Sequence, residues 1–418
     1  MEYLVQTLRC RLQSVNRTSP ATEAFLFRAA ILGLLAVFGA LAAEAQVRDR
    51  VSRIDRIDRV DRTARATTVE RSVNRTIERR QAAAAQQTQT QTGQDQPQTD
   101  SLLADQRLAR ARDGFAARRG EILALDLSDA ARTAALNAGM TVISETQVGA
   151  AFRLARMNAP PPLDLGAMLD LLRAADPAGV FDFNHAFAAS GPAPQIAPVA
   201  PGPLVVGPKL TLGMIDGGVL VSHPDLARAS IRQQAFPEAS TLTATDHGTA
   251  VAGRLADTLH SPFSLLVADV LSETGSSWTG ADAIATGLAW LSSENVRVVN
   301  ISLAGPPNAV VEQVVSRYLS GGGAIVAAVG NGGPFSALIY PAAYPGVIGV
   351  TAIDKTGRVW PQATTGPHVD RQAPGVDVSI AVIGGHIVSS GTSWAAPVVA
   401  AEIAAGATTP TPALVAAQ

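Results

Sequence analysis

Short apolar segments that end at glycine-rich turns alternate with small-residue helical segments through the second half of the chain. Clear cases are "KLTLGMIDGGV" (209–219), "VVNISLAGPP" (298–307) and "AIVAAVGNGG" (324–333). Alternating buried strands and helices form a parallel sheet with helices on both faces. Aromatic residues make up only 5% of the chain. We therefore predict an α/β domain whose core is built from small residues in close contact.

Three residues with catalytic side chains lie where such elements meet glycine. Asp216 ends the first strand, His247 precedes a small-residue helix in "TDHGTAVAG" (245–253), and Ser393 opens an apolar helix in "SGTSWAAP" (390–397). Taken singly, the aspartate is explained as a turn cap, the histidine as a structural polar residue and the serine as a helix cap. Together they supply the carboxylate, imidazole and hydroxyl that hydrolysis by a serine nucleophile needs.

The order of these residues, with the blocks around them, resembles the subtilisin-like serine peptidases (subtilases) over roughly Val205 to Ala404. The family's Asp block, which runs on to His-Pro-x-Leu, reads "GMIDGGVLVSHPDL"; its His block reads "HGTAVAG" and its Ser block "GTSWAAP". Each block alone would recur by chance, but three in order make a strong signal. The resemblance implies a subtilisin-like fold and a serine endopeptidase that acts on extended polypeptides. Ser393 would be the nucleophile, His247 the proton shuttle and Asp216 the residue that orients it.

Two intermediate segments extend the resemblance to substrate binding. By resemblance, the Asn331 side-chain amide is an oxyanion donor, aided by the Ser393 backbone N–H. Ile339 precedes the Tyr-Pro pair of "YPAAYP", a position often at the floor of the pocket for the side chain preceding the scissile bond. A branched residue there predicts a preference for small or medium apolar side chains. The segment that would pair edge-on with an extended peptide is Ser302, Leu303, Ala304 and Gly305.

The sequence departs from the family pattern in several ways. Trp394 stands where the family usually has methionine, and Ala396 where it usually has serine. Only 25 residues follow Ser393 (418 − 393), whereas the family normally continues with further helices. The alternative function is therefore a non-enzymatic, subtilase-like binding or surface protein disabled by a short C-terminus. No cofactor is identified and no run of acids indicates a calcium loop, although family calcium sites often use backbone carbonyls that a sequence hides.

Residues 101–187 have the element order of a small ferredoxin-like domain. Helices are predicted in the segments 129–140, capped by Ser128 or Asp129, and 163–175, capped by Asp164. They separate the outer strands from the inner pair, which gives βαββαβ. The strands are predicted over 120–127, 141–148, 150–157 and 179–187.

Subtilase precursors commonly carry a prodomain of this order. The resemblance implies that residues 101–187 act as an intramolecular chaperone or inhibitor; an accessory domain is the alternative. A Pro-rich linker at 188–203 leads to the catalytic domain at 204–418. Self-cleavage is expected between about Phe187 and Pro203.

The first hundred residues indicate export. An apolar run followed by Ala43-Glu44-Ala45 predicts a signal peptide over 1–45, with an uncleaved membrane anchor as the alternative. An Arg-rich tether and a Gln/Thr-rich linker, both expected to be disordered, occupy 46–100. The only cysteine is Cys10, so no intrachain disulfide can form, and a net charge of −2 argues against a nucleic-acid partner. We expect a periplasmic, cell-surface or secreted protein.

Overall fold

Contacts divide the chain into Met1–Arg75 and Thr76–Gln418. The computed structural model describes part of the second unit: residues 96–149, 152–189, 196–198, 210–236, 241–271 and 278–406. The expected signal peptide and most of the expected tether lie outside the described residues. Within the described part of the chain, no helix is long and apolar enough to cross a membrane.

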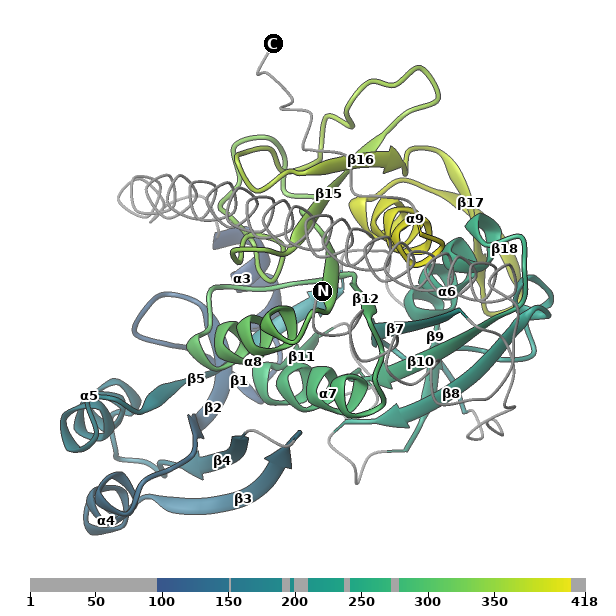
Figure 1. Cartoon of the computed structure of the whole chain (residues 1–418). Coiled ribbons are helices and arrows are strands. Elements are labelled where there is room, and N and C mark those ends of the chain that lie inside the picture. Colours follow the sequence, from purple (N-terminus) through teal and green to yellow (C-terminus); the bar gives the residue numbers. More distant parts are fainter. Residues whose placement is uncertain are drawn as a thin grey trace, which may run out of the picture. The chain divides into compact units, whose positions relative to one another are not determined.

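A parallel sheet forms the centre of the larger domain (Figure 1). Its strand order is β16-β15-β14-β12-β7-β10-β8. The strand order reverses beside β7, which lies between β10 and β12; ligands of such sheets bind outside the carboxyl ends of the strands at this point. The strands are β7 (Thr211–Asp216), β8 (Ala229–Ala235), β10 (Phe263–Asp269), β12 (Val298–Ile301), β14 (Ala324–Ala328), β15 (Ile348–Ile353) and β16 (Arg371–Pro374).

Helices cover both faces of this sheet because side chains alternate along each strand. Leu212 and Met214 of β7 pack in one hydrophobic cluster, with α6 (Asp246–Thr258) and α9 (Thr392–Ala404). Ile215 of the same strand packs in another, with α7 (Ala281–Ser293) and α8 (Ala309–Ser320). The predicted subtilisin-like α/β architecture is confirmed.

A smaller antiparallel sheet precedes the parallel one. Its βαββαβ elements give the strand order β5-β2-β4-β3, which is the ferredoxin-like arrangement. Ser128 and Asp164 cap its two helices, as their sequence positions predict. The elements are β2 (Ala116–Leu125), α4 (Asp129–Asn137), β3 (Thr141–Val148), β4 (Phe152–Asn158), α5 (Leu165–Ala175) and β5 (Val180–Ala189). They are preceded by α3 (Gln96–Leu102), which begins inside the range expected to be disordered linker, and by β1 (Leu108–Arg110).

Strand β5 links the small domain to the large one. Its last residues pair with β13 (Leu303–Ala304) on one edge and with β11 (Trp278–Gly280) on the other. Beyond it, β6 (Ile196–Pro198) pairs with β9 (Thr243–Thr245). The range 188–203, expected to be Pro-rich linker, therefore contains strand residues. Backbone pairing with the larger domain holds them extended, and local composition does not reveal such pairing.

Candidate active site

Asp216 and His247 form a buried hydrogen-bonded pair at the carboxyl end of the parallel sheet. Asp216 ends β7, and His247 is the second residue of α6. His247 Nδ1 and Asp216 Oδ1 are 2.7 Å apart. Because a carboxylate only accepts, Nδ1 carries the proton and Nε2 keeps its lone pair. No described group hydrogen-bonds this buried Nε2, which is the nitrogen that a serine hydrolase uses as its base.

Two glycines allow α6 to approach the end of β7 this closely. A Cβ on Gly248 would lie 2.2 Å from the Gly217 carbonyl oxygen, and one on Gly217 would lie 2.2 Å from Thr245 Oγ1. Thr245 is the N-cap of α6, and its hydroxyl accepts the Gly248 N–H. The absence of side chains at both glycines therefore lets the helix start hold His247 against Asp216.

Ser393 is the second residue of α9. The N-cap of this helix is Gly391, and no side chain caps it, so the interpretation of Ser393 as a helix cap is wrong. The helix begins at Thr392, before the apolar run, and Pro397 lies in its second turn. The serine thus lies where the helix dipole favours developing negative charge.

Ser393 contacts Ser302, and the residue after it packs against the histidine. Its Oγ is 3.4 Å from the Ser302 carbonyl oxygen, and Ser302 Oγ donates in turn to the Ser393 carbonyl. The next residue, Trp394, is fully buried, and its ring centroid lies 5.2 Å from that of His247. A tryptophan at this position therefore packs against the imidazole.

Asn331 lies in the loop after β14, beside the first turn of α9. Its Oδ1 accepts hydrogen bonds from the Thr392 N–H at 3.0 Å and from the Thr392 hydroxyl at 2.8 Å. Both partners are donors, so Nδ2 must occupy the other amide position. A Cβ on Gly391 would lie 3.4 Å from Nδ2, so this donor lies at the helix end that carries Ser393.

The predicted substrate-binding segment is paired with another strand of the same chain. Leu303 lies opposite Ala189 of β5, and Ala304 lies opposite Ala188. The next residue, Gly305, pairs instead with Tyr340, to which it both donates and accepts. The end of β5 therefore takes the backbone positions that an extended peptide would use.

Two apolar side chains pack against glycines near this edge. Phe187 of β5 is fully buried, and a Cβ on Gly305 would lie 2.5 Å from its ring. Ile339 is half-buried, and a Cβ on Gly330 would lie 2.3 Å from its Cδ1. Ile339 thus packs on Gly330, and its role in a specificity pocket stays a prediction.

A cavity of about 360 Å³ lies between β3 and α7, and none of the predicted site residues lines it. An extended peptide needs no deep cavity, because backbone pairing to a strand edge supplies much of its affinity. We therefore place the candidate site at the edge of the strand segment 302–305 and not at this cavity.

Two threonines that position the site have no role assigned to them by the sequence motifs. Thr245 caps the helix of His247, and Thr392 anchors Asn331. A threonine at a helix start is the available signal, since such residues commonly satisfy orphan backbone groups. Sequence analysis identified Trp394 as unusual, but its contact with His247 depends on how two helices pack, which no local pattern encodes.

No described side-chain cluster fits calcium. Two groups have ligand atoms close enough to share an ion: His223 with Asp225 and His386, and Asp113 with Asp182 and His185. Each includes imidazole, whereas calcium takes six to eight oxygen ligands. The sequence identified no cofactor, and calcium bound through backbone carbonyls is not tested by these side chains.

The chain is similar to known proteins over its second half. The model of the Subtilase family matches residues 207–412. Subtilisin E of Bacillus subtilis is 35% identical over 214 residues, which cover 46% of this chain and 54% of that protein. Subtilisin of Bacillus pumilus is 36% identical over 214 residues, which cover 46% of this chain and 75% of that protein. The thermostable alkaline protease of Halalkalibacterium halodurans is 34% identical over 206 residues, covering 47% and 56%.

A solved structure supports the same fold. Fervidolysin from Fervidobacterium pennivorans, a keratinolytic enzyme related to subtilisin, matches with a TM-score of 0.55 and 19% identity over 69% of this chain and 54% of that one. At this identity the match shows the fold alone. The chain spans about half the length (54%) of several curated relatives, but 75% of the Bacillus pumilus subtilisin at 36% identity. With all three sequence blocks in place on a subtilisin-like fold, the chain belongs to the subtilase family.

Proposed function

We propose that this protein is a serine endopeptidase that hydrolyses peptide bonds in extended polypeptide segments. The observation that carries the proposal is the buried pair of His247 and Asp216, 2.7 Å apart, at the carboxyl end of β7. The pair fixes the imidazole tautomer that can accept a hydroxyl proton. Ser393 follows at a helix start, with its neighbour Trp394 packed on the same imidazole.

In the proposed reaction, Ser393 Oγ attacks the peptide carbonyl while His247 Nε2 takes its proton. The tetrahedral oxyanion is bound by Asn331 Nδ2 and the Ser393 N–H. His247 then gives the proton to the leaving amine, and the carbonyl remains esterified to Ser393. Water, deprotonated by the same nitrogen, attacks the ester and releases the acid. Asp216 keeps Nδ1 protonated and stabilises the imidazolium that forms twice in each cycle.

Substrate would bind as an added strand between β11 and β13. The support comes from β5, which already pairs with both strands in this way. Recognition through backbone hydrogen bonds tolerates many sequences, so polypeptides are the proposed substrate class. The Ile339 side chain would then limit the size of the residue preceding the cut bond.

We further propose that the small domain, residues 101–187, inhibits the site until it is cut away. The same β5 pairing supports this, because substrate and β5 need the same two edges. The proposed arrangement is an exported precursor with a signal peptide at 1–45 and a catalytic domain from 204.

Fluorophosphonate labelling tests the peptidase proposal. The purified chain should take the probe at Ser393, before or after limited proteolysis within 188–203, and the adduct is located by mass spectrometry. Ser393→Ala should take none, and His247→Ala should react far more slowly because the base is lost. If the folded wild type takes no label in either state, the peptidase proposal is wrong.

A further inference from the structure

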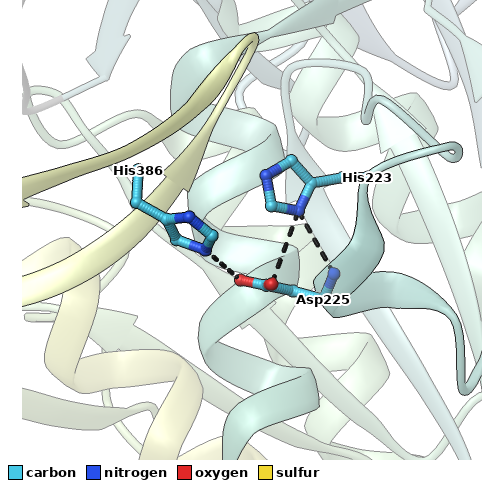
Figure 2. A group of neighbouring side chains, drawn as sticks. All are labelled: His223, Asp225 and His386. Carbon is cyan, nitrogen blue, oxygen red and sulfur yellow. Dashed lines mark hydrogen bonds and ion pairs between the residues drawn. The ribbon is translucent and has the colours of Figure 1, made fainter.

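A cluster of two histidines and one aspartate lies outside the proposed chemistry (Figure 2). His223 and Asp225 flank the start of η1 (Pro224–Leu226), and His386 belongs to β18 (Gly385–Ser389). One potential ligand atom from each of the three side chains lies within 4.8 Å of the other two. We propose that these three side chains bind a divalent transition-metal ion, with zinc the best chemical match.

The hydrogen bonds of His223 prepare it as a ligand. Its Nε2 lies 3.1 Å from the Gly385 carbonyl oxygen, which can only accept. Nε2 therefore carries the proton, and Nδ1 presents its lone pair toward Asp225. A metal-binding histidine usually donates its other N–H to a carbonyl or carboxylate in this way, which fixes the ring. Nδ1 accepts a long hydrogen bond of 3.3 Å from the Asp225 N–H.

The distances among the donors suit a small ion. Asp225 Oδ2 is 2.8 Å from His386 Nε2, and Asp225 Oδ1 is 3.8 Å from His223 Nδ1. Ligand atoms about 2 Å from a tetrahedral ion lie roughly 3.4 Å apart. The observed spacings lie on either side of this value, so modest side-chain rotation closes the site. In Figure 2 a nitrogen of each ring is joined to Asp225 by dashed lines.

The three ligand side chains favour some metal ions over others. Two imidazoles and one carboxylate match zinc, copper or nickel, whereas magnesium and calcium prefer oxygen alone. His223 is buried, while the His386 side chain is 47% exposed. Solvent can thus reach the site and supply the fourth ligand of a tetrahedral zinc ion as water.

The ion would fasten a hairpin that touches both helices of the proposed active site. β17 (Val378–Val382) and β18 form this hairpin. At its turn, the Ile383 N–H donates to Asp246, the first residue of α6, and at its end Ser389 Oγ accepts from the Trp394 indole. Binding of the ion only to the folded state would raise stability by mass action. The proposed role is structural, and it is independent of the peptidase reaction.

Zinc binding to the full chain tests the site. Chain stripped with EDTA is titrated with Zn²⁺ at pH 7.5 by calorimetry, and bound zinc is counted by atomic emission. The decisive variant is His386→Gln, which can still donate to Asp225 but lacks the imidazole ligand. The matched control is His260→Ala, which removes an exposed histidine elsewhere. Wild type and control should bind one Zn²⁺ with equal affinity and melt at a higher temperature with it.

His386→Gln should bind at least about 100-fold more weakly, since even loss of an outer-shell partner typically costs 10–100-fold. Asp225→Asn should weaken binding as well, with circular dichroism confirming that each variant is folded. The proposal is overturned if wild type binds no zinc, if His386→Gln binds like wild type, or if His260→Ala loses the ion. In the first case the cluster is only a His386–Asp225 ion pair.

Discussion

Thr392 is the residue on which the position of Asn331 depends. Its backbone N–H and its hydroxyl both donate to Asn331 Oδ1, and the same hydroxyl accepts the Gly330 N–H at 3.1 Å. One threonine therefore joins the loop after β14 to the start of α9. An oxyanion donor stabilises charge only when it is held in place before the reaction, so Thr392 is a positioning residue for the proposed hydrolysis.

This arrangement predicts graded effects on turnover. Asn331→Leu should lower kcat by about 10²–10³, the usual loss for one oxyanion donor. Thr392→Val keeps the volume and the backbone N–H but removes the hydroxyl, so it should lower kcat by a smaller factor with KM little changed. Thr392→Ser keeps the hydroxyl and should behave like wild type. Steady-state hydrolysis of a peptide substrate measures all three; equal kcat values for Val and Ser would contradict the positioning role.

Burial of the proposed catalytic residues could not be read from the sequence. Asp216 and Ser393 are fully buried, and His247 is 4% exposed. The three sequence blocks predicted which residues are the candidate catalytic ones, because each block is a motif of neighbouring residues. Trp394 packs against His247 from a different helix, so no local pattern contains the burial of this imidazole.

Strand β5 pairs with strands of both domains. Within the small domain it pairs with β2, and its last residues pair with β11 and β13 of the large domain. Phe187 lies in this second stretch, and its fully buried ring packs against Gly305. We therefore expect Phe187 to anchor the small domain to the proposed substrate edge.

Phe187→Ala should weaken this anchor, because truncating a buried phenylalanine typically costs about 3–5 kcal/mol. After cleavage in 188–203, the variant's small domain should dissociate sooner than that of wild type, and peptide hydrolysis should appear earlier. Gel filtration of the cut protein measures the retained fragment. Phe335→Ala is the control, since that ring is 82% exposed. Equal retention by all three proteins would show that Phe187 is no anchor.

A second contact of β5 involves a buried carboxyl. Asp182 Oδ2 accepts the Ala309 N–H at 2.7 Å, at the first residue of α8. Burial raises the pKa of Asp182, and it outweighs the opposing effects of nearby His185 and of backbone hydrogen bonds. The folded state therefore holds this proton at a higher pH than the unfolded chain does. The stability that the proton contributes is complete below the ordinary carboxyl pKa and is lost as pH rises through the raised one.

Asp182→Asn should consequently change how stability depends on pH. The melting temperature of wild type minus that of Asp182→Asn should become more positive as pH falls from 7.5 to 4.5. Both proteins carry Ser393→Ala to keep the chain joined, and differential scanning calorimetry measures the difference. Asp170→Asn is the comparison, because a hydrogen bond from Arg112 lowers the pKa of that exposed carboxyl. A difference for Asp182→Asn that is flat or shrinks at low pH would contradict this assignment.

Sequence patterns predicted most helices and strands, but they predicted fewer of the contacts between these elements. β3 has the predicted bounds, Thr141–Val148, and α5 begins after the predicted cap Asp164. Alternation and capping are local signals, so they are readable in one segment. The pairing of Ala188 with Ala304 is not, because its energy comes from backbone groups more than a hundred residues apart. The contact between His386 and Asp225 could not be predicted either, because the two residues are far apart in the sequence.

At the scale of the whole molecule, the antiparallel sheet extends from the small domain into the large one. β11 and β13 belong to the large domain by sequence, yet both pair with β5. Cutting the chain after β5 would break none of these pairs, so the small domain should remain bound at first. Inhibition would then end only when the fragment unfolds or is digested.

The strand register also selects the bond for self-cleavage. Ala188 and Ala189 lie opposite Ala304 and Leu303, and the residue before Leu303 is Ser302, whose carbonyl is 3.4 Å from Ser393 Oγ. We expect cleavage after Ser190. Mass spectrometry of the wild-type chain should find a new N-terminus at Gly191, whereas Ser393→Ala should stay joined. A cut in both proteins would point to another protease, and an intact wild type with a labelled Ser393 would make the small domain an accessory domain of an active peptidase.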